Sequence, residues 1–596
     1  MTKLLVLGPA RRRWIIALTS AVGSAALAVA AVPAASAATA AHAAGLPKAI
    51  HASHTMGVRK LGTVNVGALA AADAKKHAAS AATAHRVMPV RLFPGAKTAS
   101  RASSAAAPSV AGVGLTPITN SNVSGEHGFD GLTSVINAGA NPAIGDVAPP
   151  DQGLAVGPSP SGTIMMEFLN QSLNLYSTSG ATLAGDIPAY QLFALAPSAF
   201  LSDPRAYWDP SSGHWFLTMF TFGAAAGDNV QYVDVSVTKD PFGSYAIYAI
   251  PTNDPSATGC PCFGDFDQVG SDANGFYIAT NEFSFATPAF NGAYIYAFSK
   301  GNLIANAEGL GPVPAIFLYK VPLADPFGSY HIAPSTVTQG AKAPGTEYFV
   351  ESNGNLPYDG STFGNGLEVF TLSNTALLNS NLEPTLSVTG VGTESYSQPL
   401  NVNQKIGPNP LGQANNDAVA QLQTDFNAVQ EVTYTHGLLY AELNTGFNSG
   451  NNSGAAWFVL KPVSPSTANL VNDGYVFTSQ NLLYPAIGIN SDGNGYMVMT
   501  VAGPNRFPSA AYVKFKGSDG PSGDVHIAAS GTASEDDFTC YANTNSIGAF
   551  PCRWGDYSMA QAFNGKIYQA TEYVAPQPRD PFSNWGTRMW FAPDPS

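Results

Sequence analysis

A short unit centred on a glycine turn recurs along the chain, and this repeat restricts the fold more than any other feature of the sequence. Each unit has an apolar run, a turn that contains Gly or Asn-Gly, and a second apolar run, followed by a variable loop. The clear copies have their turn glycines at Gly162, Gly213, Gly275, Gly437, Gly495 and Gly565, and a degenerate copy lies near Gly345. Tandem units of this kind predict one repeat architecture and not several unrelated domains.

The chain after residue 112 has the pattern of a β protein. Gly, Asn, Ser and Pro recur every few residues and separate short runs rich in Tyr, Phe and Val, whereas helix signals are scarce. Repeated groups of short antiparallel strands that close on themselves form a β-propeller. We therefore predict an all-β fold, a single multi-bladed β-propeller, with seven blades preferred and six or five as alternatives. A double β-sandwich and a β-helix are the other folds that fit short strands.

A second repeat is a turn motif. Asp240-Pro-Phe-Gly-Ser-Tyr245 recurs unchanged as Asp325-Pro-Phe-Gly-Ser-Tyr330, with a shorter echo at Asp580-Pro-Phe-Ser583. Asp followed by Pro favours a tight turn, because Pro fixes φ at the second turn position. We expect this to be the same turn in different copies of one unit.

The first residues predict export. Three arginines, Arg11 to Arg13, precede an apolar stretch from Trp14 to Val32, and Ala35-Ser36-Ala37 is a small-residue cleavage signal. We interpret residues 1–37 as a secretory signal peptide and expect a secreted, extracellular protein with no membrane span. An N-terminal membrane anchor is the alternative, and general secretory and twin-arginine export both stay open.

Residues 38–112 are mostly Ala, Ser, Thr and His, with almost no aromatic residues. This region offers too little apolar area to offset chain entropy, so we predict a low-complexity, disordered leader. Residues 113–596 would then form the β-propeller domain. A change in charge supports this boundary, because nearly all of the 40 Asp and Glu residues follow residue 112, whereas about half of the 27 Lys and Arg residues precede it.

The body of the chain is therefore strongly acidic. Acidic surfaces repel phosphate backbones, so nucleic acid is not an expected partner. Cations, neutral glycans and basic peptides are compatible with this charge, although acidity also serves the simple solubility of an exported protein. We expect a monomer whose ligand is an extracellular glycan or protein.

The four cysteines form two local pairs, Cys260 with Cys262 and Cys540 with Cys552. Export favours disulfides, and we prefer a bridge between Cys540 and Cys552, which would close a short loop. A bridge between Cys260 and Cys262 would form a tight ring, so pairing between the two clusters is an open alternative. No Cys and His spacing is that of a zinc site.

Several motifs occur in an order that resembles secreted bacterial sialidase-like (BNR-repeat) β-propeller proteins, over about residues 125–595. They are Ala148–Pro158, Ser202–Arg205, Thr238–Tyr245, Gly264–Asp267, Arg553–Ser558 and Asn584–Arg588. The resemblance implies the propeller fold and an extracellular location, but no particular activity, since most such proteins have none assigned. The chain departs from true sialidases: complete Asp-boxes are absent, and neither an arginine triad nor a Tyr–Glu nucleophile pair can be placed.

Aligning the units on their turns places a Glu after the second apolar run in five of them: Glu167, Glu282, Glu351, Glu442 and Glu572. An Asn lies close by in four, at Asn170, Asn281, Asn353 and Asn444. Equivalent positions in successive blades surround the propeller axis, so these carboxylates are candidates to converge on one opening and recruit a cation. Glu167, Glu351 and Glu442 are thus candidate metal ligands, with calcium as the cofactor considered. The structural alternative places these residues at strand ends, facing solvent or capping turns.

A second acidic set lies near the start of several units: Asp151, Asp203, Asp267 and Asp556. Together with Glu282 and Glu572 these are the candidate catalytic residues, because paired carboxylates act as acid and base in glycoside cleavage. Candidate ligand-binding residues beside them are Arg205 and Arg553, suited to a substrate carboxylate, and Trp554 and Tyr557, suited to sugar stacking. The structural alternative is that each Asp accepts hydrogen bonds from the backbone of the neighbouring blade, and that the aromatic residues pack between blades.

Two functions fit these observations. No nucleophile elbow and no glycine-rich phosphate loop is present, so no catalytic motif is specific. The leading hypothesis is a secreted propeller that binds extracellular glycan or protein ligands through its axial face. The alternative is a glycoside hydrolase or polysaccharide lyase that uses Asp and Glu at the axial opening, which leaves open whether the protein is an enzyme.

Overall fold

The computed structural model describes residues 49–73, 85–87, 114–223, 229–254, 259–285, 290–321, 331–352, 363–424, 427–447, 452–541, 544, 551–577 and 579–595. The predicted signal peptide lies outside these residues. In the part of the chain that is described, no helix is long and apolar enough to cross a membrane.

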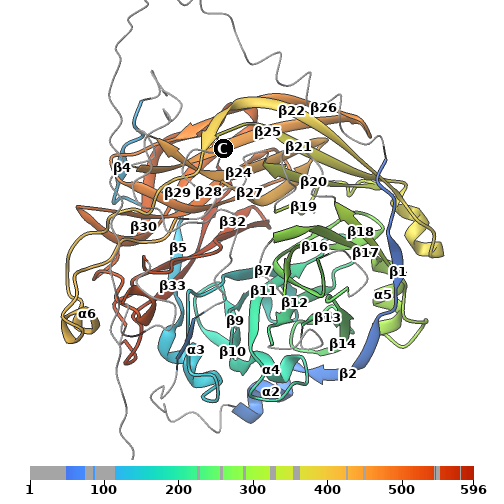
Figure 1. Cartoon of the computed structure of the whole chain (residues 1–596), viewed down its shortest axis with the longest axis horizontal. Coiled ribbons are helices and arrows are strands. Elements are labelled where there is room, and N and C mark those ends of the chain that lie inside the picture. The colour runs from blue at the N-terminus through green and yellow to red at the C-terminus, as the bar shows by residue number, and fades with distance from the viewer. Residues whose placement is uncertain are drawn as a thin grey trace, which may run out of the picture.

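Antiparallel sheets arranged around a common centre make up the body of the molecule (Figure 1). Each sheet has its first strand nearest the centre, and these inner strands are β7, β11, β15, β19, β23, β27 and β31. Successive inner strands contact one another, and the last of them, β31, contacts the first, β7. A closed ring of radial sheets is the architecture of a β-propeller, so the predicted mainly β fold is confirmed.

The strands follow one another outward in sequence order. The first sheet contains β7 (Gly153–Ser159), β8 (Gly162–Phe168), β9 (Ser172–Ser177) and β10 (Thr182–Pro188). The second contains β11 (Leu201–Trp208), β12 (Trp215–Thr221), β13 (Val230–Ser236) and β14 (Ser244–Pro251). The third contains β15 (Cys262–Ser271), β16 (Gly275–Ser284), β17 (Phe290–Ser299) and β18 (Ile316–Val321).

The next eight strands form two successive four-strand groups, joined by a parallel pairing of β19 with β23. They are β19 (Ala333–Val337), β20 (Thr346–Ser352), β21 (Phe363–Ser373), β22 (Thr385–Ser397), β23 (Val429–Thr435), β24 (Leu438–Phe447), β25 (Asn452–Ser464) and β26 (Thr467–Val476). The last two sheets contain β27 (Asn481–Ile489), β28 (Asn494–Gly503), β29 (Arg506–Lys516) and β30 (Gly520–Ala529), then β31 (Met559–Phe563), β32 (Lys566–Tyr573) and β33 (Gly586–Pro593).

Helices are short and lie in the connections and at the N-terminal side. They are α2 (Val66–Asp73), α3 (Ser134–Ala140), α4 (Ala189–Leu192), α5 (Lys300–Ala307) and α6 (Pro410–Ala414), with 3-10 turns η2 (Thr375–Ser380), η3 (Gly517–Asp519) and η4 (Phe538–Cys540). Two further short strands, β3 (His85–Val87) and β6 (Asp146–Ala148), pair in parallel.

The glycine turns of the sequence repeat join the inner strand of a sheet to its second strand. Left-handed backbone explains the glycine at several of them: φ is 111° at Gly162, 76° at Gly213, 80° at Gly437 and 72° at Gly565. In the copy that contains Gly495 the left-handed residue is Gly493, with φ 85°. The predicted repeat unit is therefore the first hairpin of each sheet.

The turn motif does not occupy one equivalent place. Asp240 starts the turn between the third and fourth strands of its sheet, β13 and β14, whereas Asp580 lies between the second and third, β32 and β33. In both copies the Asp side chain accepts backbone N–H groups two residues on, at 3.1 Å from Phe242 and 2.7 Å from Phe582. The expectation of one repeated turn is wrong for this pair, because an Asp-Pro turn is a local structure that suits any tight connection. The copy at Asp325 lies outside the described residues.

Part of the region predicted to be a disordered leader is ordered, which corrects that prediction. Residues 49–73 contain β1 (His54–Met56), β2 (Arg59–Asn65) and α2, and we call this segment the N-terminal belt. β2 adds to the outer edge of β14, and β1 adds to the outer edge of β18 (Figure 1). Composition did not predict this, because an edge strand is held by backbone hydrogen bonds and needs little apolar area of its own.

An early strand also completes the last sheet. β5 (His127–Thr133) pairs antiparallel with β33, and the shorter β4 (Ile118–Thr119) pairs in parallel with β30. The final sheet thus combines three strands from the C-terminal part of the chain with one strand that precedes the first sheet. This pairing closes the ring by hydrogen bonds.

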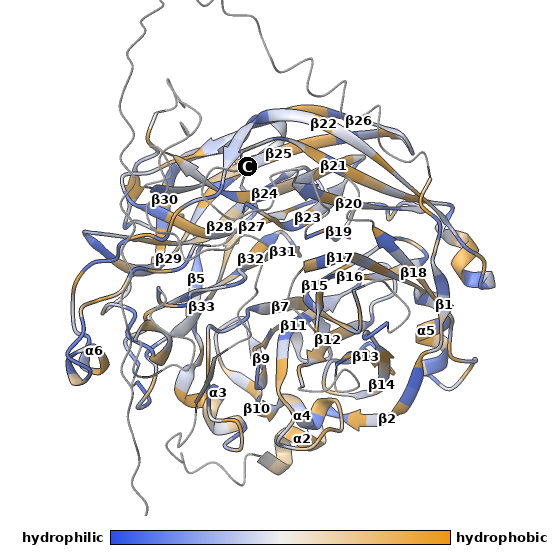
Figure 2. Cartoon of the chain, viewed as in Figure 1, coloured by the Kyte–Doolittle hydropathy of each residue, from blue (hydrophilic) through white to orange (hydrophobic). Residues whose placement is uncertain are grey.

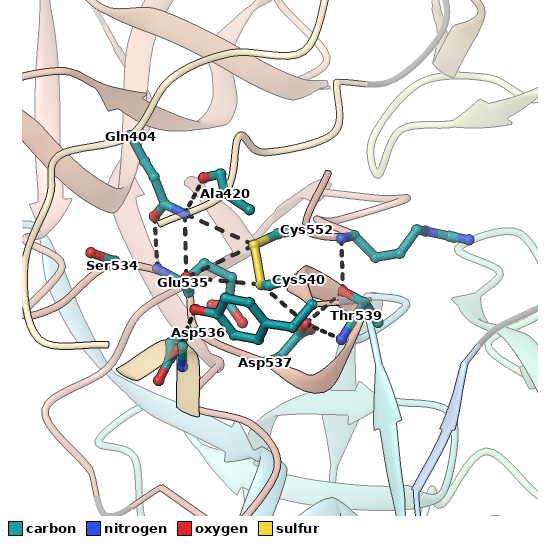
Figure 3. Close-up of a disulfide and its surroundings, with 12 residues drawn as sticks. Gln404, Ala420, Ser534, Glu535, Asp536, Asp537, Thr539, Cys540 and Cys552 are labelled. Atoms are coloured by element: carbon teal, nitrogen blue, oxygen red, sulfur yellow. Dashed lines mark hydrogen bonds between the residues drawn. A yellow bond between two sulfur atoms is a disulfide. The ribbon is translucent and has the colours of Figure 1, made fainter. Parts of the chain in front are cut away.

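The two ends of the ring differ. Inner strands begin at one end, which we call the cover end, and finish at the hairpin end, where they turn into the second strands. Two long connections lie at the cover end and are called the cover segments; their described residues are 398–424 and 427–428 in the first, and 530–541, 544 and 551–558 in the second. They pack together: the Cys552 N–H donates to Gln421 O at 2.7 Å. The Glu535 N–H donates to Gln404 Oε1 at 2.7 Å (Figure 3).

Hydrophobic residues run along the strands of every sheet (Figure 2). They form buried clusters between neighbouring sheets, as where Trp208 of β11 and Leu154 of β7 share one cluster. A separate buried cluster joins the cover segments to the sheets below and includes Leu422, Tyr484 and Trp554. The core of the molecule is thus divided into layers between blades, with an extra layer at the cover end.

Candidate functional site

The acidic residues predicted from the repeat do lie at one end of the molecule. Antiparallel pairing puts the start of each inner strand beside the finish of the second strand, as in the pairing of Asp265 with Asn281. The whole set is nevertheless buried, with 0–4% of each residue exposed: Asp151, Asp203, Asp267, Asp556, Glu167, Glu282, Glu351, Glu442 and Glu572. The cover end therefore presents none of these carboxylates to solvent.

A backbone irregularity repeats around the cover end. Residues other than glycine have left-handed φ at the start of several inner strands: Asp203 (52°), Phe266 (60°), His331 (65°), Tyr484 (50°) and Asp556 (85°). At Asp203, Phe266 and Tyr484 this conformation coincides with a β-bulge in the pairing to the second strand. Left-handed φ costs free energy for such residues, so something must hold each of them.

Side chains of the preceding sheet hold these residues. In four of these left-handed residues the backbone N–H donates to a side-chain oxygen from the sheet before it. The bonds run from Asp203 N to Asp151 Oδ2 (3.4 Å), from Phe266 N to Asp203 Oδ2 (2.9 Å), from His331 N to Asn281 Oδ1 (2.9 Å) and from Tyr484 N to Asn444 Oδ1 (2.8 Å). We call these contacts the blade staples. For Asp151 and Asp203 the geometry thus agrees with the structural alternative considered from the sequence.

Two further candidates are also engaged in packing. Asp267 Oδ2 accepts the Thr218 hydroxyl at 3.0 Å and the Gln231 amide at 2.8 Å, both from the preceding sheet. Burial and the neighbouring Asp203 carboxylate raise the pKa of Asp267. Glu282 accepts the Thr280 hydroxyl at 2.6 Å, and burial raises its pKa to about 8.

The candidates near Asp556 form a buried group of their own. Arg553 Nη2 lies 2.6 Å from Asp556 Oδ2, and the Gly555 N–H donates to Glu572 Oε2 at 2.6 Å. Burial, then neighbouring carboxylates including Asp537 and Asp556, raise the pKa of Glu572 well above its usual range. Trp554 is fully buried in the cluster that joins the cover segments to the sheets. Arg553 and Trp554 are therefore packed inside the cover end.

The glutamates predicted as metal ligands are not brought together. Glu167 accepts Leu132 N–H at 2.9 Å and so links the first sheet to β5, while Glu442 accepts Glu431 N–H at 2.9 Å. Glu351 of β20 lies opposite Glu368 of the neighbouring strand β21. Among the described residues there is no group of three or more His, Cys, Asp or Glu arranged to hold a metal ion. Alignment of the units on their turns does not fix which face a Glu takes, because a shift of one residue turns a side chain to the other face of its strand. Asn353 lies outside the described residues.

A cavity runs along the propeller axis instead, and we call it the axial channel. Every inner strand contributes to its wall: it is lined by Leu154, Arg205, Gln268, Thr336, Gln339, Gln430, Glu431, Ile489, Met559 and Gln561, among others. Its free volume is about 60 Å³, so it is narrow. Thr336, Gln339, Glu431, Met559 and Gln561 are half-buried, and the lining continues to the ends of the inner strands, so the channel opens toward the hairpin end.

Arg205 lies at the inner limit of this channel. Its side chain is 1% exposed, and it touches two other sheets: Nε donates to Asp267 O at 2.8 Å, and Cζ lies 3.5 Å from the centre of the Tyr557 ring. Nη1 lies 3.8 Å from Met559 Sδ, and Nη2 has no hydrogen-bond partner among the described residues. A buried guanidinium donor without a partner is uncommon, and here it borders a cavity.

Glu431 is a channel residue that the sequence repeat did not single out. It is half-buried, and its Oε2 accepts the Ala560 N–H at 3.4 Å. Burial raises its pKa to about 8, and the nearby Arg205 charge opposes that shift. A bulge that β23 shares with β11 and β15 places it in the channel: Gln430-Glu431 lie in β23 where Asp203-Pro204 lie in β11 and Phe266-Asp267 lie in β15.

No protein-family model and no curated protein matches this chain, so the BNR-repeat resemblance is not supported at the level of a family. Solved structures that resemble it include the phage phi92 endosialidase, at 11% identity over 64% of this chain and 66% of that one, with a TM-score of 0.29. A Trypanosoma rangeli sialidase shares 12% identity over 71% of this chain and 57% of that one, with a TM-score of 0.31. An ulvan lyase shares 10% identity over 73% and 93%, with a TM-score of 0.33. Similarity at these TM-scores supports no conclusion about this chain, and the propeller architecture is inferred from the sheet arrangement described above.

Proposed function

We propose that this chain is a secreted, monomeric, seven-bladed β-propeller that binds an extracellular glycan at the axial channel, with Arg205 holding an anionic group of the ligand. The observation that carries this proposal is the partnerless Nη2 of Arg205 at the inner limit of a cavity that opens at the hairpin end. Guanidinium donors fixed in one orientation are well suited to a carboxylate. Tyr557 fixes that orientation by stacking on the guanidinium.

Binding is favoured over catalysis by the roles of the carboxylates. Asp151, Asp203 and Asp267 accept hydrogen bonds that join neighbouring sheets, and Asp556 is paired with Arg553. Carboxylates that hold such hydrogen bonds and are buried from solvent cannot contact the glycosidic bond of a substrate. The narrowness of the channel favours a single protruding ligand group, such as a uronate carboxylate, over a whole sugar chain.

A glycoside hydrolase or polysaccharide lyase is the second candidate function, and Glu431 is the observation that favours it. A carboxyl with a pKa of about 8 is protonated at neutral pH and can donate a proton to a leaving group. In this version Glu431 is the general acid and Arg205 the group that binds the substrate carboxylate.

An array of neutral and uronate-bearing glycans, followed by calorimetry on the hits, tests the binding proposal. Uronate-bearing glycans should bind, and Thr336→Phe, which narrows the channel at a half-buried position, should weaken binding at least tenfold. Thr467→Phe, at an exposed position on β26, is the matched control and should bind normally. Equal affinity of the unaltered protein, Thr336→Phe and Thr467→Phe for the glycan would show that the channel is not the binding site. Release of reducing or unsaturated ends from the same glycans, lost in Glu431→Gln, would establish the enzymatic alternative.

A further inference from the structure

The structure contains two disulfides, Cys260–Cys262 and Cys540–Cys552, which excludes pairing between the two clusters. They differ in exposure. Cys260 is half-buried and Pro261 is exposed, whereas Cys262 is fully buried at the start of β15. Cys540 and Cys552 are both buried, within the cluster that joins the cover segments to the sheets. Cys260 is therefore the one cysteine of the four that is not fully buried, so an outside molecule would approach the first disulfide from the side of Cys260.

The two disulfides also differ in what they can contribute to stability. Cys540 and Cys552 are 12 residues apart, so their bond closes a loop whose freedom in the unfolded chain is substantially reduced. Cys260 and Cys262 are separated by a single residue, so their bond restricts the unfolded chain very little. Chain entropy therefore gives the second bond a stabilising effect and gives the first bond very little.

Neighbouring groups hold the Cys260–Cys262 segment in place. The Cys262 N–H donates to Asn253 O at 3.1 Å, and Pro261 O accepts the Phe285 N–H at 3.0 Å. These bonds do not involve sulfur, so they survive if the S–S bond is broken. Cys262 would then stay buried at the start of β15, while Cys260 would stay near the surface.

The side-chain amide of Asn291 in β17 lies within hydrogen-bond distance of both sulfur atoms. Its Nδ2 lies 3.4 Å from Cys260 Sγ and 3.4 Å from Cys262 Sγ, so it donates toward either one. A side chain at position 259 would prevent this approach, because a Cβ there would lie 2.4 Å from Asn291 Oδ1, and Gly259 has φ 86°. An N–H donor aimed at a sulfur stabilises the thiolate that forms when the disulfide opens.

We propose that Cys260–Cys262 is a reactive disulfide that oxidises thiols. An incoming thiolate attacks Cys260 Sγ, a mixed disulfide forms, and the S–S bond breaks with its electron pair leaving on Cys262 as a thiolate. A second thiolate then attacks the sulfur of the first thiol, which releases the oxidised disulfide product and leaves Cys260 as a thiolate. Two electrons pass from the two thiols to the protein, and both cysteine thiolates take up protons from solvent.

The first test compares the two disulfides in one native chain. The protein is incubated in graded glutathione buffers, free thiols are alkylated, and the modified cysteines are identified by mass spectrometry. Cys260 and Cys262 should be reduced and alkylated while Cys540 and Cys552 remain bonded. Simultaneous loss of both disulfides, or loss of Cys540–Cys552 first, would overturn the proposal. A parallel arm with a reduced, unfolded protein as thiol donor distinguishes protein thiols from small thiols as the substrate.

The second test identifies which sulfur is attacked. Cys262→Ser leaves Cys260 as the free thiol, and Cys260→Ser leaves the buried Cys262. Cys262→Ser should form a mixed disulfide with oxidised glutathione at least tenfold faster than Cys260→Ser, and Asn291→Ala should slow reduction of the native disulfide about tenfold. Faster capture in Cys260→Ser, with both variants keeping the native melting temperature, would contradict attack at Cys260.

Discussion

Arg205 reaches the axis because of the two residues before it. Asp203 has left-handed φ and lies with Pro204 in a β-bulge, and a bulge re-aims the side chains that follow it. The guanidinium of Arg205 is thereby turned from the interface between sheets toward the axial channel, where it stacks on the ring of Tyr557, two residues before β31. A ligand-binding role for Arg205 thus depends on a local irregularity of the strand.

Glu431 and Glu282 give the stability of the folded protein an unusual pH dependence. Each has its pKa raised to about 8 in the folded state, whereas an unfolded glutamate titrates near its ordinary value. Between these values the folded protein binds more protons than the unfolded chain, so the stability contribution falls as pH rises from about 4 to 8.

Melting curves from pH 5 to pH 8.5 test this. The melting temperature should fall across the range, and both Glu431→Gln and Glu282→Gln should flatten the fall, since neither amide has to lose a proton. Asp519→Asn, at an exposed position, is the control and should leave the pH profile unchanged. A melting temperature that rises with pH in the unaltered protein would contradict the raised pKa values.

At the scale of elements, the blade staples explain how left-handed residues persist at the start of the inner strands. Asn444 shows the arrangement most fully: its Oδ1 accepts the Tyr484 N–H, and its Nδ2 lies 3.1 Å from Gly454 O and 3.1 Å from Leu482 O. One buried amide thus joins β24 to the next sheet and holds the bulge at Tyr484.

Asn444→Leu should therefore destabilise the protein by about 1–3 kcal/mol, because buried backbone groups lose their partners. Denaturant unfolding measures this cost. The matched control is Asn469→Leu at an exposed position on β26, which should change the free energy of unfolding by less than about 0.5 kcal/mol. Equal effects from both substitutions would mean that the staple contributes nothing specific.

The elements differ in how far the sequence predicts them. Glycines such as Gly213 and Gly437 mark the first hairpins because only a left-handed turn requires them. The structural alternative for Asp151 and Asp203 agrees with the staple geometry, but which face a side chain takes depends on bulges, and bulges leave no fixed sequence signal. Glu167, Glu351 and Glu442 therefore form no common metal-binding group among the described residues, and Glu431 was not among the predicted site residues. The N-terminal belt was missed because its strands are held by backbone pairing.

At the scale of the whole molecule, segments from the N-terminal side secure the ring. β5 supplies the outer strand of the last sheet, and Glu167 of β8 accepts the Leu132 N–H of β5, so this strand is joined to both the last sheet and the first. The N-terminal belt, by contrast, adds strands to the outer edges of two sheets that already have four strands each. It also packs α2 against β10 and bridges Ile50 to Leu386 of β22. Closure of the ring therefore depends on β5, and the belt is an addition to a closed structure.

Two truncated chains separate these roles. A protein that starts at Gly114 lacks the N-terminal belt but keeps β4 and β5, so it should fold cooperatively with a melting temperature a few degrees below that of the full chain. A protein that starts at Ser134 also lacks β5, which leaves the edge of β33 unpaired and Glu167 without its Leu132 donor. It should show no cooperative thermal transition, and a peptide of residues 114–133 added in trans should restore one. Cooperative unfolding of the chain that starts at Ser134, without added peptide, would show that the contact between β31 and β7 closes the ring by itself.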